Sequence, residues 1–257
     1  MIKLGVCSSV DNAALLKEIG FDYLELGMSS TSALSEEEFE VLRRKAERAG
    51  LPVLAMNGML PSDFHLCSDQ LDTQGLTAYL HKAFSRAQAL GVKTVVFGSG
   101  GARRYPLDME YALAMDYLVA YLRLAGPLAD NYGLSIAVEP LREQECNIIN
   151  SVMEARQLAK MANQANVGVL ADLFHMAAGK EGFMGMRLGP LLHCHIAEAA
   201  KRAYPRAGDG SQGLYDSFFE ALRHVGYQGG VSIEGSAQNL EQDARQAFAL
   251  LDGLRRA

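Results

Sequence analysis

The stretch Val167-Gly168-Val169-Leu170-Ala171-Asp172-Leu173-Phe174-His175 places a carboxylate and an imidazole at the end of an apolar run. Val167 to Leu170 is typical of a buried strand, and Asp172 stands where that strand should end. An aspartate at the mouth of a strand, with a histidine three residues later, suits a metal ion and a hydroxylated ligand. Asp172 is equally typical of a helix N-cap, so this stretch alone leaves both interpretations open.

Three other stretches repeat the pattern. Ser135 to Glu139 is an alternating strand that closes on Glu139, Leu191 to Ile196 carries His193 and His195, and Gly230 to Gly235 contains Glu234. Because strand side chains alternate between two faces, small residues and the final polar residue share one face, while bulky apolar residues share the other. If the strands are parallel, Glu139, Asp172, His195 and Glu234 converge at one end of a sheet.

Eight such strands alternate with helices along the chain. The strands are expected at 2–6, 21–26, 51–57, 93–97, 135–139, 167–172, 191–195 and 230–234, with helices at 10–19, 36–49, 73–90, 108–131, 151–163, 214–225 and 240–254. This rhythm predicts an α/β protein with a closed parallel (β/α)₈ TIM barrel, forming a single domain over residues 1–257. A doubly wound open sheet competes, but the first turn lacks a Gly-x-Gly-x-x-Gly pattern. In a barrel, the C-terminal strand ends form the active site.

Local signals mark several boundaries. Ser35-Glu36-Glu37-Glu38 is a capping box that predicts the start of the second long helix. Gly126-Pro127 predicts a kink or a restart in the helix over 108–131. Residues 58–72 form a long loop, and loops of that length in a compact domain are often functional.

Composition restricts the class of protein. The 257 residues carry a formal charge of −6, which disfavours a nucleic-acid or anionic-membrane surface. No apolar run of 18 residues exists, so no membrane span is expected. The N-terminus shows no cleavable signal pattern, and four dispersed cysteines favour reduced thiols in a cytoplasmic protein. The oligomeric state stays open, with a homo-oligomer among the options.

Three carboxylates and one imidazole form a credible site for one divalent metal ion. The oxygen-rich set favours Mn²⁺ or Mg²⁺ and is compatible with Zn²⁺ or Co²⁺. Four protein ligands leave two positions of an octahedral ion for substrate or water oxygens. Such an ion polarises a carbonyl and stabilises an enediolate. Two glutamates on opposite sides of the barrel could then exchange a proton with either face of a carbon.

The ordered motifs resemble the sugar phosphate isomerase/epimerase family, which has the xylose isomerase-like barrel, and are closest to those of its ketose 3-epimerases. Glu139-Pro140-Leu141 through Glu145 and Asn150 resembles the family's fifth-strand motif, and Asp172-Leu173-Phe174-His175-Met176 resembles its sixth. The segment from His193 to Glu198 resembles the seventh, and Ser232-Ile233-Glu234 the eighth. The resemblance spans the chain.

The resemblance implies roles for these residues. Glu139, Asp172, His195 and Glu234 would be the metal ligands, and Glu139 and Glu234 the catalytic acid–base pair. Glu145, His175 and an arginine after the seventh strand would hold substrate oxygens. The family carries that arginine six residues after the metal-binding histidine, where this chain has Lys201 followed by Arg202. Its Gly-Thr-Gly-His segment is also replaced, by Gly208-Asp209-Gly210-Ser211, so aldose–ketose isomerisation stays open beside 3-epimerisation.

Further candidates for substrate binding lie near the predicted strand ends. Arg103 follows a glycine run and could bind a phosphate or carboxylate, although a solvated loop is an equal alternative. Asn57 ends the third strand, His65 belongs to the long loop, and Glu198 is part of the seventh-strand motif. His193 is expected to pack beneath His195 or to support it rather than to ligate a metal.

The sequence therefore predicts an isomerase or epimerase of a sugar or sugar phosphate. One alternative is a metal-dependent dehydratase or lyase, because it would begin with the same proton abstraction. An AP endonuclease-like phosphodiesterase would share the barrel but needs further histidines, and Asn57, Gly98 and Asp209-Gly210-Ser211 do not supply them. A sugar-binding protein without turnover is the fourth alternative, and the retained pair Glu139 and Glu234 opposes it.

Overall fold

Eight parallel strands close into a barrel in the computed structural model, which describes residues 1–257. The strands are β1 (Lys3–Cys7), β2 (Tyr23–Gly27), β3 (Val53–Asn57), β4 (Thr94–Phe97), β5 (Ser135–Val138), β6 (Val167–Asp172), β7 (His193–Ile196) and β8 (Gly230–Ile233). Each strand pairs with the next in sequence, and β1 pairs with β8 to close the sheet. The predicted α/β TIM barrel is confirmed.

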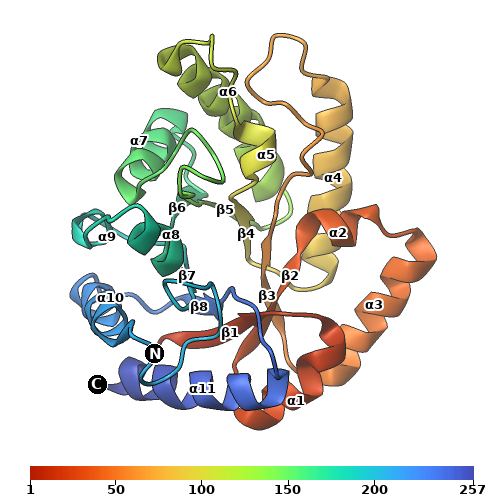
Figure 1. Cartoon of the computed structure of the whole chain (residues 1–257). Helices are drawn as coiled ribbons and strands as arrows, with labels where there is room; N and C mark the ends of the chain where they lie inside the picture. The colour runs from red at the N-terminus through yellow and green to blue at the C-terminus, as the bar shows by residue number, and fades with distance from the viewer.

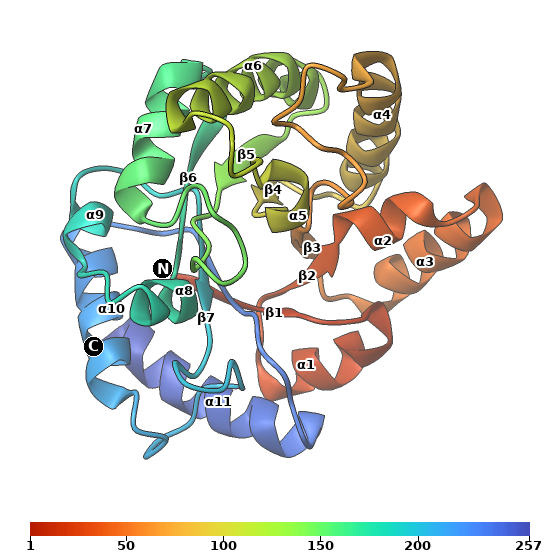
Figure 2. The same ribbon diagram turned by 45° about the horizontal axis from the view of Figure 1, so that its top comes forward.

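Helices surround the strands as an outer ring (Figures 1 and 2). They are η1 (Val10–Asn12), α1 (Ala13–Ile19), α2 (Met28–Ala33), α3 (Glu36–Ala49), α4 (Thr73–Ala89), α5 (Gly100–Arg103), α6 (Tyr111–Asp130), α7 (Val152–Ala162), α8 (Leu173–Ala178), α9 (Met184–Arg187), α10 (Gln212–His224) and α11 (Leu240–Arg256). The last helix, α11, packs beside α1, where the Phe21 and Phe248 rings meet edge to face at 5.2 Å. The ring of helices thereby closes along with the sheet.

The predicted helix boundaries hold where a cap specifies them. Ser35 and Glu38 form the expected capping box at the start of α3, and Gly50 ends that helix with φ +65°. The chain does not restart a helix at Gly126-Pro127, because α6 continues through Pro127 to Asp130. Only three residues of helix follow this proline, so the hydrogen bond that it cannot make lies in the last turn of the helix.

Two apolar layers hold the fold together. A core of 65 buried residues fills the space between the strands and the surrounding helices. A second, small cluster of Val96, Ala137 and Leu170 lies apart from that core, with Leu192 packed against it. Val96, Ala137 and Leu170 come from β4, β5 and β6, and Leu192 directly precedes β7, as expected for side chains that fill a barrel interior in layers.

The interior between β1, β2 and β8 is filled by the Tyr23 ring. A Cβ atom at Gly5 or Gly230 would overlap that ring, so glycine is required on both neighbouring strands. The Tyr23 hydroxyl lies 2.7 Å from the Ser232 Oγ. Tyr23 and Ser232 thus fill the barrel interior below the carboxyl ends of the strands.

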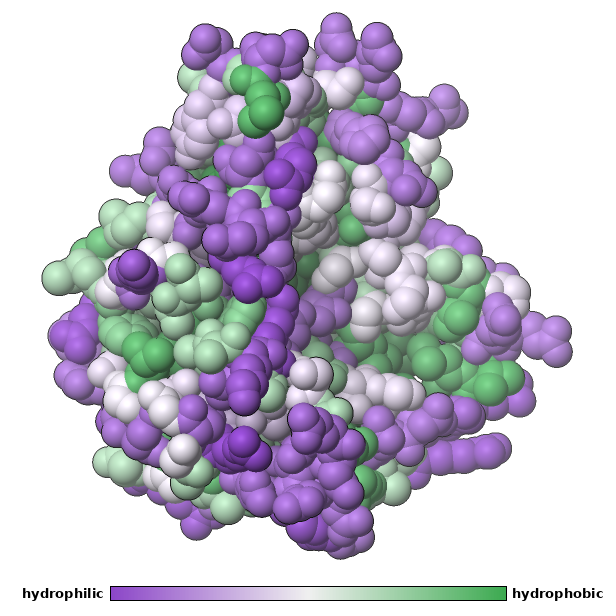
Figure 3. Space-filling model, in the orientation of Figure 1, coloured by the Kyte–Doolittle hydropathy of each residue, from purple (hydrophilic) through white to green (hydrophobic).

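The surface is largely polar. On the face seen in Figure 1, a band of strongly hydrophilic residues crosses the middle, with hydrophobic residues scattered on either side (Figure 3). None of the helices combines the length and the apolar composition that crossing a membrane requires.

Candidate metal and substrate site

Four side chains from successive strands meet at the carboxyl end of the barrel. Glu139 follows β5, Asp172 ends β6, His195 lies in β7 and Glu234 follows β8, and one ligand atom from each lies within 4.8 Å of the others. The His195 Nδ1 is 2.9 Å from the Glu139 carboxylate, 3.8 Å from that of Asp172 and 3.4 Å from that of Glu234. Three carboxylates and one imidazole are a donor set that fits a divalent cation.

Strand register and one glycine produce this geometry. His195 is level with Asp172 on β6 and with Ser232 on β8, so the polar residues of three neighbouring strands reach the same height. Gly98 follows β4, and a Cβ atom there would collide with the Glu139 carboxylate. The absence of a side chain at Gly98 therefore gives Glu139 the room to turn toward the other three residues.

Asp172 has two structural roles at once. Its Oδ1 accepts hydrogen bonds from the backbone N–H groups of Phe174 at 2.7 Å and His175 at 3.2 Å, which caps α8. Its Oδ2 remains on the side of His195. The two interpretations left open by the sequence therefore coexist, since the cap fixes the carboxylate that the cluster uses.

Burial and neighbouring charges separate the pKa values of the carboxylates in the absence of a cation. Burial and the charge of Glu234 raise the pKa of Glu139, and burial together with Glu139 raises the pKa of Asp172 to about 7. Burial alone would also raise the pKa of Glu234, but His195 and Arg202 bring it to about 2. Without a cation, the two glutamates therefore occupy environments with opposite effects on their pKa values.

Polar side chains surround Glu234. The Asn57 Nδ2 donates a hydrogen bond to one Glu234 oxygen at 2.8 Å, and the Arg202 Nη2 donates to the other at 2.5 Å. The Arg202 Nη1 also lies 3.4 Å from the Glu145 carboxylate, which pairs with Arg142 at 2.7 Å. Among the residues expected to bind substrate, Asn57, Arg202 and Glu145 are therefore linked directly to the four-residue cluster or to one another.

His175 also lies beside the cluster. Its Nδ1 accepts a hydrogen bond from the Arg142 backbone N–H at 3.2 Å, so the proton of the neutral ring is on Nε2. That Nε2 is buried, has no hydrogen-bond partner and lies 3.8 Å from the Asp172 carboxylate. Burial, reinforced by the charge of Arg202, lowers the pKa of His175 to about 4. The neutral ring therefore has one unused donor beside the cluster.

Arg202, rather than Lys201, is the cation that reaches the cluster. The Glu198 carboxylate accepts hydrogen bonds from the backbone N–H groups of Ala200 and Lys201, and Arg202 then takes a left-handed backbone with φ +51°. This turn directs the Arg202 guanidinium toward Glu234 and over the Phe174 ring at 5.1 Å. The Lys201 side chain is exposed and makes no ion pair. The turn thus lets Arg202 reach the cluster although it stands one residue later in the sequence than the family's arginine.

Three other expected substrate-binding residues are placed differently. Arg103 is fully buried, and its guanidinium donates hydrogen bonds to the backbone carbonyls of Phe97 and Ile149, so it offers no free fork to a phosphate or carboxylate. Both oxygens of Glu198 are used within its own turn. His65 is exposed in the long loop and forms no hydrogen bond or ion pair with the cluster. For Arg103, both the expected binding of a phosphate or carboxylate and the alternative of a solvated loop were wrong, because residues 100–103 form α5 and the side chain is buried.

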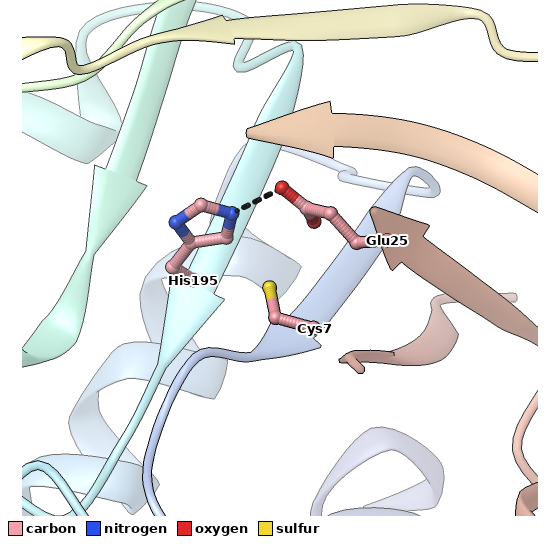
Figure 4. A group of neighbouring side chains, drawn as sticks. All are labelled: Cys7, Glu25 and His195. Atoms are coloured by element: carbon pink, nitrogen blue, oxygen red, sulfur yellow. Dashed lines mark hydrogen bonds and ion pairs between the residues drawn. The ribbon is translucent and has the colours of Figure 1, made fainter. Parts of the chain in front are cut away.

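Glu25 and Cys7 lie on the opposite side of His195 (Figure 4). The Glu25 Oε1 is 2.9 Å from the His195 Nε2, and ligand atoms of Cys7, Glu25 and His195 all lie within 4.8 Å of one another. Glu25 and Tyr23 are two residues apart on β2, so strand alternation places them on one face without indicating a partner for Glu25. The pairing with His195 joins β2 to β7 across the barrel, so no local pattern could predict it.

A cavity opens beside this cluster at the ends of β1, β2 and β3. Its volume is about 410 Å³. Its lining consists of Cys7, Ser8, Ser9, Val10, Glu25, Leu26, Gly27, Ser30, Thr31, Leu42 and Asn57. The wall contains hydroxyl and amide groups as well as apolar side chains, and no lysine or arginine contributes to it. A polyol chain matches such a lining better than a phosphate group does.

The chain matches a family model described as a xylose isomerase-like TIM barrel over residues 13–254. Among curated proteins, it is 26% identical to a D-psicose 3-epimerase of Agrobacterium fabrum strain C58 over 228 residues, covering 84% of this chain and 75% of the relative. It is 24% identical to a 3-dehydro-D-guloside 4-epimerase of Escherichia coli strain K12 over 241 residues, covering 91% and 88%.

Solved structures show the same fold. A D-psicose 3-epimerase crystallised in the presence of D-fructose superposes with a TM-score of 0.85 and 20% identity, over 100% of both chains. A 3-keto-D-glucoside 4-epimerase from E. coli superposes with a TM-score of 0.80 and 22% identity, also over 100% of both chains.

Proposed function

The chain belongs to the xylose isomerase-like TIM barrel family and is an isomerase, and on this basis we propose that it is a divalent-metal-dependent epimerase of an unphosphorylated keto sugar. The observation that carries the proposal is the convergence of Glu139, Asp172, His195 and Glu234 at the barrel mouth. Relatives named as sugar epimerases support the reaction class, and the structure contributes the residues and their arrangement.

The four-residue cluster fits one cation. Its three carboxylates favour Mn²⁺ or Mg²⁺, and the imidazole also admits Zn²⁺ or Co²⁺. A bound divalent cation supplies Lewis-acid polarisation of the sugar's carbonyl oxygen, which acidifies the hydrogen on the adjacent carbon. The buried, unpartnered His175 Nε2–H beside Asp172 adds a donor for a substrate oxygen.

Glu139 and Glu234 are the proposed acid–base pair. They follow β5 and β8, which lie on either side of β6 and β7, and each carboxylate would approach the substrate carbon from its own strand. One glutamate removes the proton beside the carbonyl, and the other returns a proton to the opposite face.

Arg202, Glu145 and His175 are the proposed orienting residues. Arg202 holds the Glu234 carboxylate at 2.5 Å and lies beside Glu145, so it can control both the direction of Glu234 and the position of a sugar hydroxyl. The buried His175 keeps one donor free. Together these side chains would fix the reacting carbon between Glu139 and Glu234.

The proposal of an unphosphorylated substrate follows from charge. The 410 Å³ cavity beside Glu25 and Asn57 has serine and threonine hydroxyls but no basic side chain in its wall. The nearby cations Arg142 and Arg202 already pair with carboxylates. A phosphate in the cavity would lie near Glu25 and Glu234 without a compensating charge, whereas a neutral polyol tail could bond to the hydroxyls.

Epimerisation at C4 of a 3-keto glycoside is the second candidate. The extent of the sequence alignment favours this candidate, because the alignment covers 88% of the E. coli 4-epimerase but 75% of the A. fabrum 3-epimerase. The chemistry is the same in both reactions, since each begins at a carbon beside a ketone. The carbon that is inverted therefore separates the two candidates.

Solvent-deuterium exchange measured by NMR tests the proposal. The Mn²⁺-loaded protein is incubated in D₂O with ketoses, their phosphates and 3-keto glycosides, and manganese is removed by chelation before the spectra are recorded. Deuterium at C3 of a free ketose, with formation of its epimer, is the expected result, whereas deuterium at C4 of a keto glycoside would select the second candidate. Loss of water from the product would instead indicate the dehydratase alternative, and no exchange with any sugar would refute the proposal.

A further inference from the structure

Beneath the four-residue cluster lies a buried carboxylate that the proposed reaction does not use directly. Glu25, from β2, is 1% exposed and contacts two histidines of β7. Its Oε1 lies 2.9 Å from the His195 Nε2, and its Oε2 lies 2.7 Å from the His193 Nε2. Each oxygen thus faces a different ring, and Figure 4 shows the Glu25 side chain pointing at His195 from across the barrel.

A chain of hydrogen bonds anchors Glu25 from below. The His193 Nε2 also lies 3.3 Å from the Ser232 Oγ, and that hydroxyl lies 2.7 Å from the Tyr23 hydroxyl. The chain joins β2, β7 and β8 in the barrel interior, where the Tyr23 ring is enclosed by Gly5 and Gly230. Glu25 therefore has little freedom to rotate away from His195.

This arrangement has a consequence for the tautomer of His195. Because a carboxylate only accepts hydrogen bonds, a ring nitrogen that faces Glu25 must carry a proton. The other nitrogen, Nδ1, faces Glu139, Asp172 and Glu234, and it would give up its proton on ligating a cation held by these three carboxylates. Histidines that ligate metals are typically oriented in this way by a partner on the second nitrogen.

We propose that Glu25 is a positioning residue that, through the His195 Nε2, presents the His195 Nδ1 to a divalent cation held by Glu139, Asp172 and Glu234. The inference rests on the proposed metal-dependent function. His193, Ser232 and Tyr23 support Glu25 from the side away from the cation. Glu25 itself is not a ligand, because both of its oxygens are directed to imidazole N–H groups.

The binding of Mn²⁺ to the metal-free protein, measured by isothermal titration calorimetry, tests this role. Glu25→Gln should bind Mn²⁺ about ten- to a hundredfold more weakly than wild type, the usual cost of losing such a partner. Glu36→Gln is the matched control, because Glu36 also carries an ion pair, with Arg86, but lies at the start of α3 away from the cluster. It should bind Mn²⁺ with wild-type affinity.

Two further measurements separate positioning from a general loss of structure. Excess Mn²⁺ should restore most of the activity of Glu25→Gln, which a misfolded site would not allow. In the Mg²⁺-loaded wild type, ¹⁵N NMR should show the His195 proton on Nε2. If Glu25→Gln does not fold, the wild-type spectrum still decides, since a proton on Nδ1 overturns the proposal.

The outcomes distinguish this inference from the function on which it rests. Unchanged Mn²⁺ affinity in a folded Glu25→Gln would overturn the role of Glu25 and leave the metal-dependent epimerase intact. A wild-type protein that binds no divalent cation at Glu139, Asp172, His195 and Glu234 would overturn both.

Discussion

Glu139 and Glu234 have different environments although both end strands of one barrel. Replacement of either by glutamine removes the carboxylate that we propose accepts or returns the proton, while keeping the side chain's size. We expect kcat to fall by about 10²- to 10⁴-fold in Glu139→Gln and in Glu234→Gln, with the fold retained, as measured by epimer formation and circular dichroism. Glu143→Gln is the control, because Glu143 is exposed on the same loop as Glu145 and should keep full activity. Activity near that of wild type in either strand-end variant would remove the acid–base assignment.

Arg202 and Lys201 form a second matched pair. Arg202→Ala removes the donor 2.5 Å from Glu234 and the positive charge beside Glu145, so we expect kcat/KM to fall by at least about tenfold, the equivalent of one charged hydrogen bond of 1.5–3 kcal/mol. Lys201→Ala removes only an exposed side chain and should leave kcat/KM within about twofold. Steady-state kinetics on the substrate identified by deuterium exchange measure both values of kcat/KM. A larger loss in Lys201→Ala than in Arg202→Ala would assign the orienting role to Lys201 instead.

For single residues, the sequence predicted the positions of side chains that end strands. It did not predict side-chain positions that depend on short helices, turns or contacts with distant strands. Glu139, Asp172, His195 and Glu234 each stand at the end of an apolar alternation, so strand period and parallel topology bring them together. The burial of Arg103 depends on the short helix α5, which a glycine run does not predict. The choice between Lys201 and Arg202 depends on one left-handed residue.

Among the elements, the end of β4 has a specific requirement. Gly98→Ala would place a methyl group against the Glu139 carboxylate and push it away from His195. We expect Gly98→Ala to reduce both Mn²⁺ affinity and turnover, while its thermal unfolding stays cooperative. Gly213→Ala is the control, because a Cβ atom there meets no neighbour within 4 Å and alanine favours helix α10, by up to about 1 kcal/mol. Calorimetry and activity assays of the two variants make the comparison, and an active Gly98→Ala would show that Glu139 does not depend on that space.

Long periodic elements were predictable, and short helices at the carboxyl ends of strands were not. The eight strands and the seven long helices follow from alternation, capping boxes and glycine stops. The short helices α2, α5 and α8 have six residues or fewer, so they carry almost no period of their own. They form because strand ends and caps such as Asp172 set the direction of the chain. Arg103 lies in α5 and His175 lies in α8, so these two helices fix the positions of both side chains.

For the whole molecule, one bound cation should stabilise the barrel by linkage. Bringing three carboxylates together has an electrostatic cost that a divalent cation offsets, and binding to the folded state alone stabilises it by about 2.7 kcal/mol at a hundred times Kd. For a chain of this size we expect Mn²⁺ to raise Tm by about 5–10 °C. Differential scanning calorimetry with and without EDTA measures this shift. It should nearly vanish in Asp172→Asn, and a shift of full size in that variant would place the cation elsewhere.

The closed barrel itself was predictable because the strand–helix rhythm has no interruption over the chain. The side-chain contacts inside the barrel were less predictable from the sequence. They join Tyr23, Ser232, His193 and Glu25, which belong to three strands that meet only when the barrel closes. A barrel that converges four side chains on one point and supports one of them from below accounts for both the proposed metal site and the proposed role of Glu25.

Anomalous diffraction at the manganese edge, from crystals grown with Mn²⁺, shows whether one cation binds at the barrel mouth. We expect a single strong peak per chain, with ligand atoms of Glu139, Asp172, His195 and Glu234 all within about 2.0–2.3 Å of it. No peak at the barrel mouth, a peak that touches fewer than three of these side chains, or a cluster of three ions would contradict the proposed metal site.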